Sequence, residues 1–296
     1  MKNETTSLFL VRPASFNFNR QTAGSNSFQK ATDENKNLVH QKALLEFESV
    51  RSKLISLGLN IHCANDTSSP EKPDAIFPNN WVSFHKKFNI IYPMQAENRR
   101  LEKNLDFINA INQKEIIDLS YYEKKNEFLE GTGSMIFDHH SKKIFACLSP
   151  RTHLQPLRKV AEILDYKIFS FNAENKEKSS IYHTNVMMCI AKQFVVICLE
   201  SIPSEKQKDE LHKIFLKTNK EIIEISIAQM NHFAGNMFEV FVKGKSNFIM
   251  SAAAFKSLNK TQIGKIEYFS KIEIFNIPTI EFFGGGSIRC MVAEMQ

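Results

Sequence analysis

Short apolar runs and helical periodicities recur along the chain in the same order, at intervals of roughly 50–60 residues. Each copy starts with two apolar runs around a polar turn, continues with apolar residues at i, i+3 and i+4, and ends with one more apolar run. Runs rich in β-branched and aromatic residues predict strands, and the 3.6-residue period predicts a helix. Each copy therefore predicts a hairpin, a helix and a strand.

Four copies of this unit are clear. Their hairpins are predicted at residues 81–93, 134–147, 186–199 and 237–250, their helices near 96–111, 154–164, 203–216 and 252–268, and their closing strands at 115–119, 167–171, 221–225 and 271–275. The remaining pieces are a strand at 8–12, a helix near 41–57 and strands at 59–62 and 287–292. These pieces complete a fifth unit if the two ends of the chain pair with each other.

Two architectures fit this pattern. One is a closed ring of five α/β units, which removes the exposed edges of the sheets. The other is an ordinary open α/β sheet with helices on its faces. The pattern favours the ring, built by a single domain of residues 1–296, and ring closure would bring Cys290 close to the axis.

The composition does not alter the predicted fold, but it excludes some classes of protein. The chain is 43% hydrophobic and 24% charged, as soluble globular proteins are. Its net charge of +6 is dispersed, without the basic block or stacking aromatics of nucleic-acid binders. Five cysteines without a Cys-x-x-Cys pair predict reduced thiols. No signal peptide or membrane span is recognisable. We therefore expect a cytoplasmic protein without nucleic-acid or membrane partners, and a homodimer stays open as an assembly.

The segment 17–37 is polar and lacks periodicity, so it is predicted to be a loop. Long ordered loops in compact domains often act as lids or binding loops, and disorder is the alternative.

Three residues suggest a site that works without a cofactor. Cys290 follows the run Gly284–Gly286, where the backbone can approach a ligand closely, although a lone cysteine is more often a small core residue. His183 precedes a predicted strand and is placed as a general acid or base, with His232 as a rival. Glu130, between Phe-Leu and Gly-Thr-Gly, is able to orient a histidine or bind a cation.

Further polar residues lie in loops beside the predicted strands. Asp74, Asn79 and Asn80 lie in DAIFPNNW, and Arg151 in SPRTH offers a fork-shaped cation for a carboxylate. For each of them a solvated turn is the alternative, because turns favour Asp and Asn. The sequence contains no zinc-ligand spacing, P-loop, dinucleotide fingerprint or Gly-x-Ser-x-Gly elbow. We therefore expect neither a metal nor another cofactor.

Five segments in order, FLEGTGSM, SPRTH, IYHTN, NHFAGN and GGGSIRC, resemble the guanidine-modifying enzymes: arginine deiminases, dimethylarginine dimethylaminohydrolases and amidinotransferases. Within this group the chain resembles the branch of citrulline utilization hydrolases, or arginine-deiminase-related proteins, and the resemblance runs from VRPASF to the C-terminus. It implies the pentein fold, a five-unit α/β propeller with its active site on the axis. It also implies that Cys290 is the nucleophile, His183 the acid/base, Glu130 its partner and Arg151 the ligand of the substrate carboxylate.

Two departures from the family pattern bear on the substrate. Deiminases usually carry an aspartate at the end of the F-x-x-D segment, where this chain has Asn80, and many carry a second aspartate two residues after the histidine, where it has Asn185. Losing two carboxylates weakens binding of a cationic guanidinium, whereas amides suit a neutral ureido group. The expected function is hydrolysis of citrulline to ornithine, ammonia and carbon dioxide. The alternatives are an arginine dihydrolase or deiminase, an amidinotransferase, and a non-catalytic amino-acid-binding relative.

Overall fold

The strands of the protein form five small sheets in the computed structural model, which describes residues 4–296. Each sheet has three strands in the order β15-β1-β2, β3-β4-β5, β6-β7-β8, β9-β10-β11 or β12-β13-β14. In every sheet the middle strand pairs antiparallel with one neighbour and parallel with the other. A parallel pair needs a crossover connection, and the helices supply it. The predicted unit of hairpin, helix and strand is therefore confirmed.

The strand bounds are as follows: β1 (Ser7–Arg12), β2 (Asn60–Asn65), β3 (Val82–Phe84), β4 (Phe88–Ile91), β5 (Glu115–Asp118), β6 (Ile136–Asp138), β7 (Lys143–Cys147), β8 (Lys167–Phe171), β9 (Met188–Ile190), β10 (Phe194–Ile197), β11 (Glu221–Glu224), β12 (Phe238–Val242), β13 (Lys245–Ser251), β14 (Lys271–Phe275) and β15 (Ala293–Met295). The crossover helices are α1 (Lys36–Ser56), α2 (Glu97–Arg100), α3 (Leu105–Ile111), α5 (Leu154–Leu164), α7 (Glu205–Lys217), α9 (Ala252–Ser257) and α10 (Lys260–Phe269). Three helices, α4 (Gly131–Ser134), α6 (Thr184–Met187) and α8 (Ile227–Met230), are single turns, and α11 (Pro278–Gly284) precedes the last strand.

The two ends of the chain meet in one sheet, as the fifth unit requires. Strand β15 pairs antiparallel with β1, with Ser7 opposite Met295 and Phe9 opposite Ala293, and β1 pairs parallel with β2. The amide of Thr6 also donates to the carbonyl of Phe241 at 2.8 Å, which joins this unit to the one containing β12. Neighbouring units share apolar cores. For example, Leu8 and Leu10 on β1 belong to the same buried cluster as Val240 on β12.

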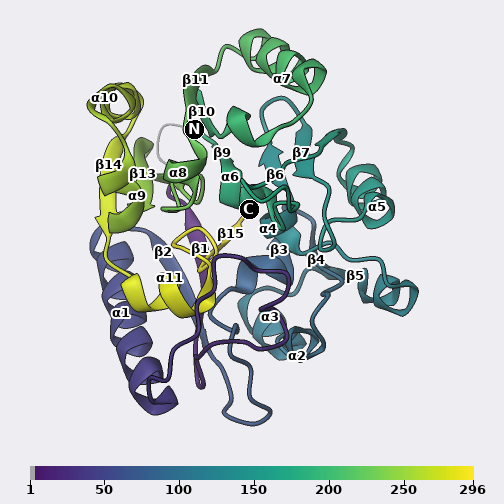
Figure 1. The fold of residues 1–296 in the computed structure, drawn as a ribbon. Helices are drawn as coiled ribbons and strands as arrows, with labels where there is room; N and C mark the ends of the chain where they lie inside the picture. Colours follow the sequence, from purple (N-terminus) through teal and green to yellow (C-terminus); the bar gives the residue numbers. More distant parts are fainter. Residues whose placement is uncertain (1–3) are drawn as a thin grey trace.

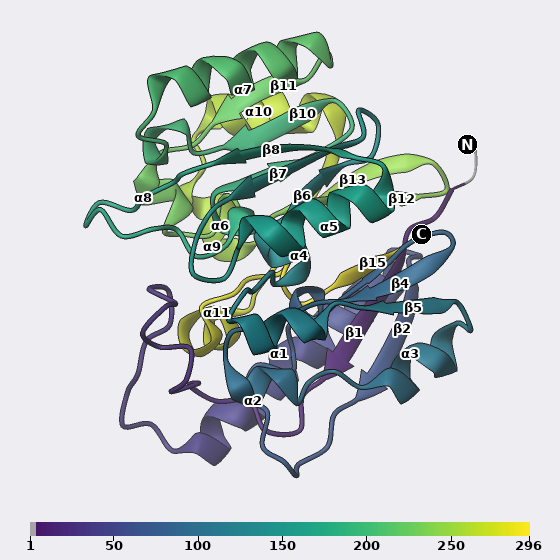
Figure 2. The same cartoon turned by 90° about the vertical axis from the view of Figure 1, so that its right-hand side faces the viewer.

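The five units surround a common axis. Strands β15 and β3 lie against each other, β9 lies between β6 and β12, and these five are the inner strands. Helices α1, α5, α7 and α10 lie on the outside, and the C-terminus lies near the centre (Figure 1). Figure 2 shows the same elements from the side, with the units of β1 and β4 below those of β7 and β10. The arrangement is the predicted ring and not the open sheet.

Helix α5 illustrates how the sequence builds the outer layer. Its buried residues Leu157, Val160 and Ala161 face the sheet at helical spacing, while Lys159 and Glu162 form an exposed ion pair. An amphipathic stripe of this kind is what a helix that covers one face of a sheet needs.

Two predicted helices are broken in the structure. The segment 96–111 forms α2 and α3, because the side chain of Asn104 caps a new helix by accepting from the amides of Asp106 and Phe107. The segment 252–268 forms α9 and α10, and Asn259 opens the second helix with a capping box. An N-cap residue stabilises a helix start, so each asparagine favours two short helices over one long helix.

The predicted strand at 287–292 is wrong. Helix α11 begins with Pro278 and ends at Gly284, because the next residue, Gly285, has a φ of +62° in the left-handed region. The chain then turns, with the amide of Cys290 donating to the carbonyl of Ser287 at 2.9 Å, and β15 begins only at Ala293. Cys290 therefore lies on a turn before an inner strand, not within a strand.

Two other predictions concern membrane-spanning helices and the cysteines. None of the helices formed by residues 4–296 is long and apolar enough to cross a membrane. Cys147, Cys189 and Cys198 are buried free cysteines, as their apolar surroundings in the sequence predicted.

Candidate active site

Each of the five units places polar residues directly before its inner strand, at one end of the axis. The segments before β3, β6, β9, β12 and β15 carry, in that order, Asn79 and Asn80, Glu130, His183 and Asn185, Asn236, and Cys290. All seven side chains are buried. The ring thus brings residues from five distant parts of the chain to one place.

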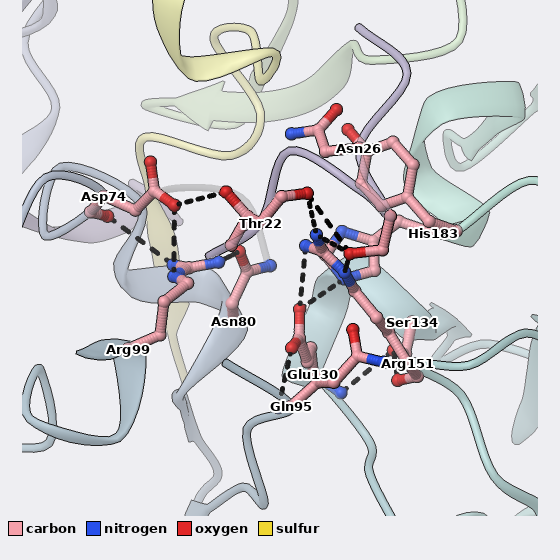
Figure 3. Close-up of polar contacts among 12 residues, drawn as sticks. Thr22, Asn26, Asp74, Asn80, Gln95, Arg99, Glu130, Ser134, Arg151 and His183 are labelled. Carbon is pink, nitrogen blue, oxygen red and sulfur yellow. Dashed lines mark hydrogen bonds and ion pairs between the residues drawn. The ribbon is translucent and has the colours of Figure 1, made fainter. Parts of the chain in front are cut away.

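His183 and Glu130 form a hydrogen-bonded pair that Arg151 extends (Figure 3). The Nε2 of His183 lies 2.8 Å from Oε2 of Glu130, and Nη1 of Arg151 donates to the same oxygen at 3.4 Å. Burial acts to raise the pKa of Glu130, but the charge of Arg151 and the hydrogen bond from His183 outweigh it and hold that pKa well below its usual range. The carboxylate is therefore ionised and accepts from Nε2–H, which leaves Nδ1 of His183 as the free acceptor.

The imidazole itself is neutral at physiological pH. Burial lowers the pKa of His183 to about 4, although the hydrogen bond and the charge of Glu130 act in the opposite direction. A neutral imidazole with an orienting carboxylate is able to take up a proton and return it, which is what a general acid/base needs.

The thiol of Cys290 is buried among side-chain amides. Nδ2 of Asn185 lies 3.3 Å and Nδ2 of Asn236 lies 3.2 Å from its sulfur. Burial raises the pKa of Cys290, and the hydrogen bonds from Asn236, from the turn at Ser287 and from Asn185 act against that rise. The amides therefore favour the charged form of a sulfur that burial alone would keep protonated.

Gly133, in the GTG segment, has a packing reason to lack a side chain. A Cβ at Gly133 would stand 2.4 Å from Nδ2 of Asn80 and 2.8 Å from Nδ1 of His183. These contacts are shorter than real Cβ atoms make, so a larger residue would displace both side chains. The same distances place the amide of Asn80 beside the free nitrogen of His183.

Asn80 is held in one orientation by Arg99. Nη1 of Arg99 donates to Oδ1 of Asn80 at 2.7 Å (Figure 3). Nε and Nη2 of Arg99 donate to Glu102 at 2.9 Å each. A guanidinium only donates, so the Asn80 oxygen faces Arg99 and its Nδ2 faces the other way. Nδ2 of Asn80 is buried and has no hydrogen-bond partner within residues 4–296.

Other polar atoms around the site also lack partners in the described part of the chain. They are Oδ1 of Asn185, Oδ1 of Asp74 and both side-chain atoms of Asn79. The second oxygen of Asp74 is engaged, since it accepts from Nδ2 of Asn19 at 2.7 Å. Because unpaired buried polar atoms are rare, a group of them at one place indicates where a polar ligand binds.

The segment 19–30 covers this site. Asn26 donates to the carbonyl of Gly284 at 3.2 Å, and Arg151 donates to Ser25 Oγ at 2.6 Å and to the carbonyl of Thr22 at 3.2 Å. The cavity between Cys290, His183, Asn80, Asp74, Arg99 and Arg151 is only about 10 Å³, room for one water molecule at most. An amino acid is larger than this cavity, so residues around it must move to admit one. The segment predicted as a loop at 17–37 is ordered and non-helical up to Asn35, where helix α1 is capped, and its residues 19–30 lie over the site.

Replacing Arg151 by alanine is expected to loosen this covering segment. The variant loses three hydrogen bonds to Ser25 and Thr22, so trypsin should cleave after the exposed Arg20 and Lys30 about tenfold faster than in the parent. The cleavage rate is measured by mass spectrometry of the native protein. Lys159→Ala, which removes only an exposed ion pair on α5, is the matched control. Equal cleavage rates in parent and Arg151→Ala would contradict the role of these contacts.

The structure brings most of the predicted site residues to one cavity. Cys290, His183, Asn80, Asp74 and Arg151 line it, while Glu130 and Asn185 touch lining residues from behind. Asn79 is fully buried next to Asn80 but does not line the cavity. His232 is exposed, its Nδ1 donates to the carbonyl of Ala228, and it lines another cavity.

Sequence reasoning missed Arg99, Asn236 and Tyr182. Arg99 lies in the polar stretch ENRR, which is typical of an exposed helix start. The hydroxyl of Tyr182 donates to the carbonyl of Gly285 at 2.8 Å, and nothing in the sequence signals this contact. Asn236 could have been identified from the repeat, because it precedes the inner strand of the fourth unit, as the other site residues precede the inner strands of their units.

Comparisons with known proteins agree with this fold. The family model of eukaryotic N,N-dimethylarginine dimethylhydrolases matches residues 12–296. No curated protein sequence matches the chain. The N-terminal domain of ArgZ, a cyanobacterial arginine dihydrolase, superposes with a TM-score of 0.77 at 13% identity, covering 98% of both chains.

Two further solved structures are similar. Unliganded AgrE superposes with a TM-score of 0.78 at 16% identity, covering 98% of this chain and 39% of AgrE. A dimethylarginine dimethylaminohydrolase variant, in an adduct with S-methyl-L-thiocitrulline, superposes with a TM-score of 0.69 at 15% identity, covering 99% of this chain and all of the other.

At these identities the structures establish the pentein fold, and the family model establishes the family. The chain belongs to the N,N-dimethylarginine dimethylhydrolase family.

Proposed function

We propose that the protein hydrolyses the ureido group of L-citrulline, with residues 1–296 acting as one catalytic domain. The observation that carries this proposal is the orientation of Asn80. Because Arg99 holds its oxygen, Asn80 presents an unpartnered N–H donor beside His183. A ureido carbonyl accepts from this donor, whereas a guanidinium has only donors and would leave it unpaired. Leaving a buried donor unpaired costs about 1–3 kcal/mol.

The charges near the sulfur support a neutral reacting group. Asn80, Asn185 and Asn236 carry no charge, and the ionised Glu130 is already paired with Arg151 and His183. The unpartnered Oδ1 of Asn185 is an acceptor for the ureido NH₂. One amide donor and one amide acceptor thus match the C=O and NH₂ groups of a urea.

Side chains of both charge signs are available for the α-amino and α-carboxylate groups at the other end of the substrate. Arg99 and Arg151 line the cavity and offer guanidinium groups to the α-carboxylate, and the unpartnered oxygen of Asp74 accepts from the α-amino group. Both arginines have other partners in the closed form, so the carboxylate would replace some of these contacts. This arrangement favours an α-amino acid over a simple urea.

The first chemical step forms a covalent intermediate. His183 takes the proton of Cys290, and the thiolate attacks the ureido carbon. The bond from this carbon to the δ-nitrogen breaks, His183 returns its proton to that nitrogen, and ornithine leaves. An S-carbamoyl group then stays on Cys290. Glu130 accepts from Nε2–H throughout and stabilises the protonated imidazole.

The second step restores the enzyme. His183 takes a proton from water, the resulting hydroxide attacks the carbamoyl carbon, and the carbon–sulfur bond breaks. The proton passes back to the sulfur of Cys290. The product, carbamic acid, decomposes to ammonia and carbon dioxide.

An arginine dihydrolase or deiminase is the second candidate. Its supporting observation is the buried carboxyl group of Asp74, which lines the cavity and has one oxygen without a partner in the described residues, so that it is available to a cationic group. An amidinotransferase would use the same thiol and replace water by an amine. A non-catalytic amino-acid-binding relative would not need the paired His183 and Glu130 beside the buried thiol.

The test incubates the purified protein separately with citrulline, arginine and dimethylarginine, and follows ornithine, citrulline and ammonia. Ornithine and ammonia from citrulline are the expected result. Arginine giving citrulline as the end product, with no ornithine from either compound, would contradict the proposal. Product formation that requires an added amine would instead identify a transferase.

A further inference from the structure

We propose that Asn236 is a positioning residue that holds the sulfur of Cys290 and stabilises it in its charged form. This inference rests on the proposed function, since it concerns the same nucleophile. It assigns a role to a residue of the NHFAGN segment in the fourth unit, which supplies no other side chain to the site.

Two backbone groups fix the orientation of the Asn236 amide. The amide of Arg289 donates to its Oδ1 at 3.2 Å, and its Nδ2 donates to the carbonyl of Asn185 at 3.0 Å. A backbone N–H only donates and a backbone carbonyl only accepts, so the opposite flip of Asn236 would place like groups against each other. Nδ2, which lies 3.2 Å from the sulfur of Cys290, is therefore a donor to it.

The backbone around Asn236 is built for this approach. A Cβ at Gly235 would stand 2.2 Å from the carbonyl oxygen of Val186, so only glycine lets this loop lie against the segment that carries Asn185. Asn236 itself is 2% exposed and lies two residues before β12. In each of the other four units, the segment before the inner strand supplies a residue of the site. Asn236 has the equivalent position in the unit that contains β12.

The surroundings of the sulfur explain why such a donor matters. Burial raises the pKa of Cys290, and the hydrogen bond from Asn236 is the largest influence in the other direction. The other titratable groups that line the cavity are the neutral His183, Tyr182, Asp74, Arg99 and Arg151. The side chain of Arg289 points away from the sulfur, toward the carbonyl of Val292 and Glu294. Asn236 and Asn185 are thus the side chains that donate to the sulfur in the described residues.

The test measures how fast iodoacetamide alkylates Cys290 as a function of pH, without any substrate. The modified peptide is quantified by mass spectrometry, because Cys63 is half-exposed and also reacts. Asn236→Ala is expected to react about tenfold more slowly than the parent at neutral pH, with the pH midpoint shifted upward. Asn236→Asp, of the same size, should react more slowly still, because a carboxylate repels the thiolate.

His232→Ala, in the same loop but exposed and away from the cavity, is the matched control and should react as the parent does. Unchanged alkylation rates in both Asn236 variants would overturn the inference. So would a lower melting temperature with an unchanged pH midpoint, because that is the signature of a purely structural asparagine. The alkylation requires no turnover, so a protein that fails to hydrolyse citrulline still tests the role of Asn236.

Discussion

Replacing Cys290 by serine is expected to lower kcat for citrulline hydrolysis by at least about a thousandfold. The S-carbamoyl intermediate cannot form without the thiol, and a serine hydroxyl, which is far less acidic than a thiol, is a much weaker nucleophile at this site. The side chain is small and buried, and the amides of Asn185 and Asn236 can donate to an oxygen as they do to the sulfur. The variant should therefore fold and keep its melting temperature within a few degrees.

The measurement is single-turnover and steady-state production of ornithine, with mass spectrometry of the intact protein to detect the carbamoyl adduct in the parent. Cys189→Ser is the matched control, because Cys189 is a buried free cysteine on β9 outside the cavity. A Cys290→Ser protein with full turnover would contradict the covalent mechanism, whatever the substrate.

Replacing Asn80 by aspartate is expected to lower the ratio of kcat/KM for citrulline to that for arginine about a hundredfold. The change removes the N–H donor for the ureido carbonyl and introduces a carboxylate that binds a guanidinium through charge-assisted hydrogen bonds. Arg99 lies 2.7 Å from the present oxygen and would pair with the new carboxylate, so the effect on folding should be small.

The experiment compares both substrates in the parent, in Asn80→Asp and in Asn79→Asp. Asn79 is the neighbouring residue, also buried, but does not line the cavity, and its substitution should change the ratio much less. An unchanged ratio in Asn80→Asp would show that this residue does not select the reacting group. A parent that already prefers arginine would favour the dihydrolase.

Periodicity predicted the repeated unit because each unit buries its own apolar faces. The strand 167–171 and the helix 154–164 were predicted at their observed bounds, and the pairing of the chain ends followed from the need to close the ring. Periodicity cannot show where a helix stops when a cap interrupts it, as Asn104 and Asn259 do. It also assigned the apolar residues around Cys290 to a strand, although their burial comes from packing on the axis.

The candidate site was predictable where a residue stood out from its neighbours. Glu130 between apolar residues and glycines, and His183 before a strand, are examples. Arg99 was not predictable, because its burial arises from contacts with Asn80, Asp74 and Glu102, which only the folded chain brings together. The same holds for the covering segment, whose contacts to Arg151 span more than 120 residues.

The pairing of β15 with β1 has a consequence for how the protein folds. The strand that follows Cys290 must find a partner about 285 residues earlier in the chain, with Ser7 opposite Met295. Contacts of such long range close late and slow the folding of a domain. Until they form, β1 presents an unpaired edge, which is a site for association with other chains. We therefore expect the nucleophile to be assembled in the last step of folding, and the enzyme to gain activity more slowly than it gains secondary structure.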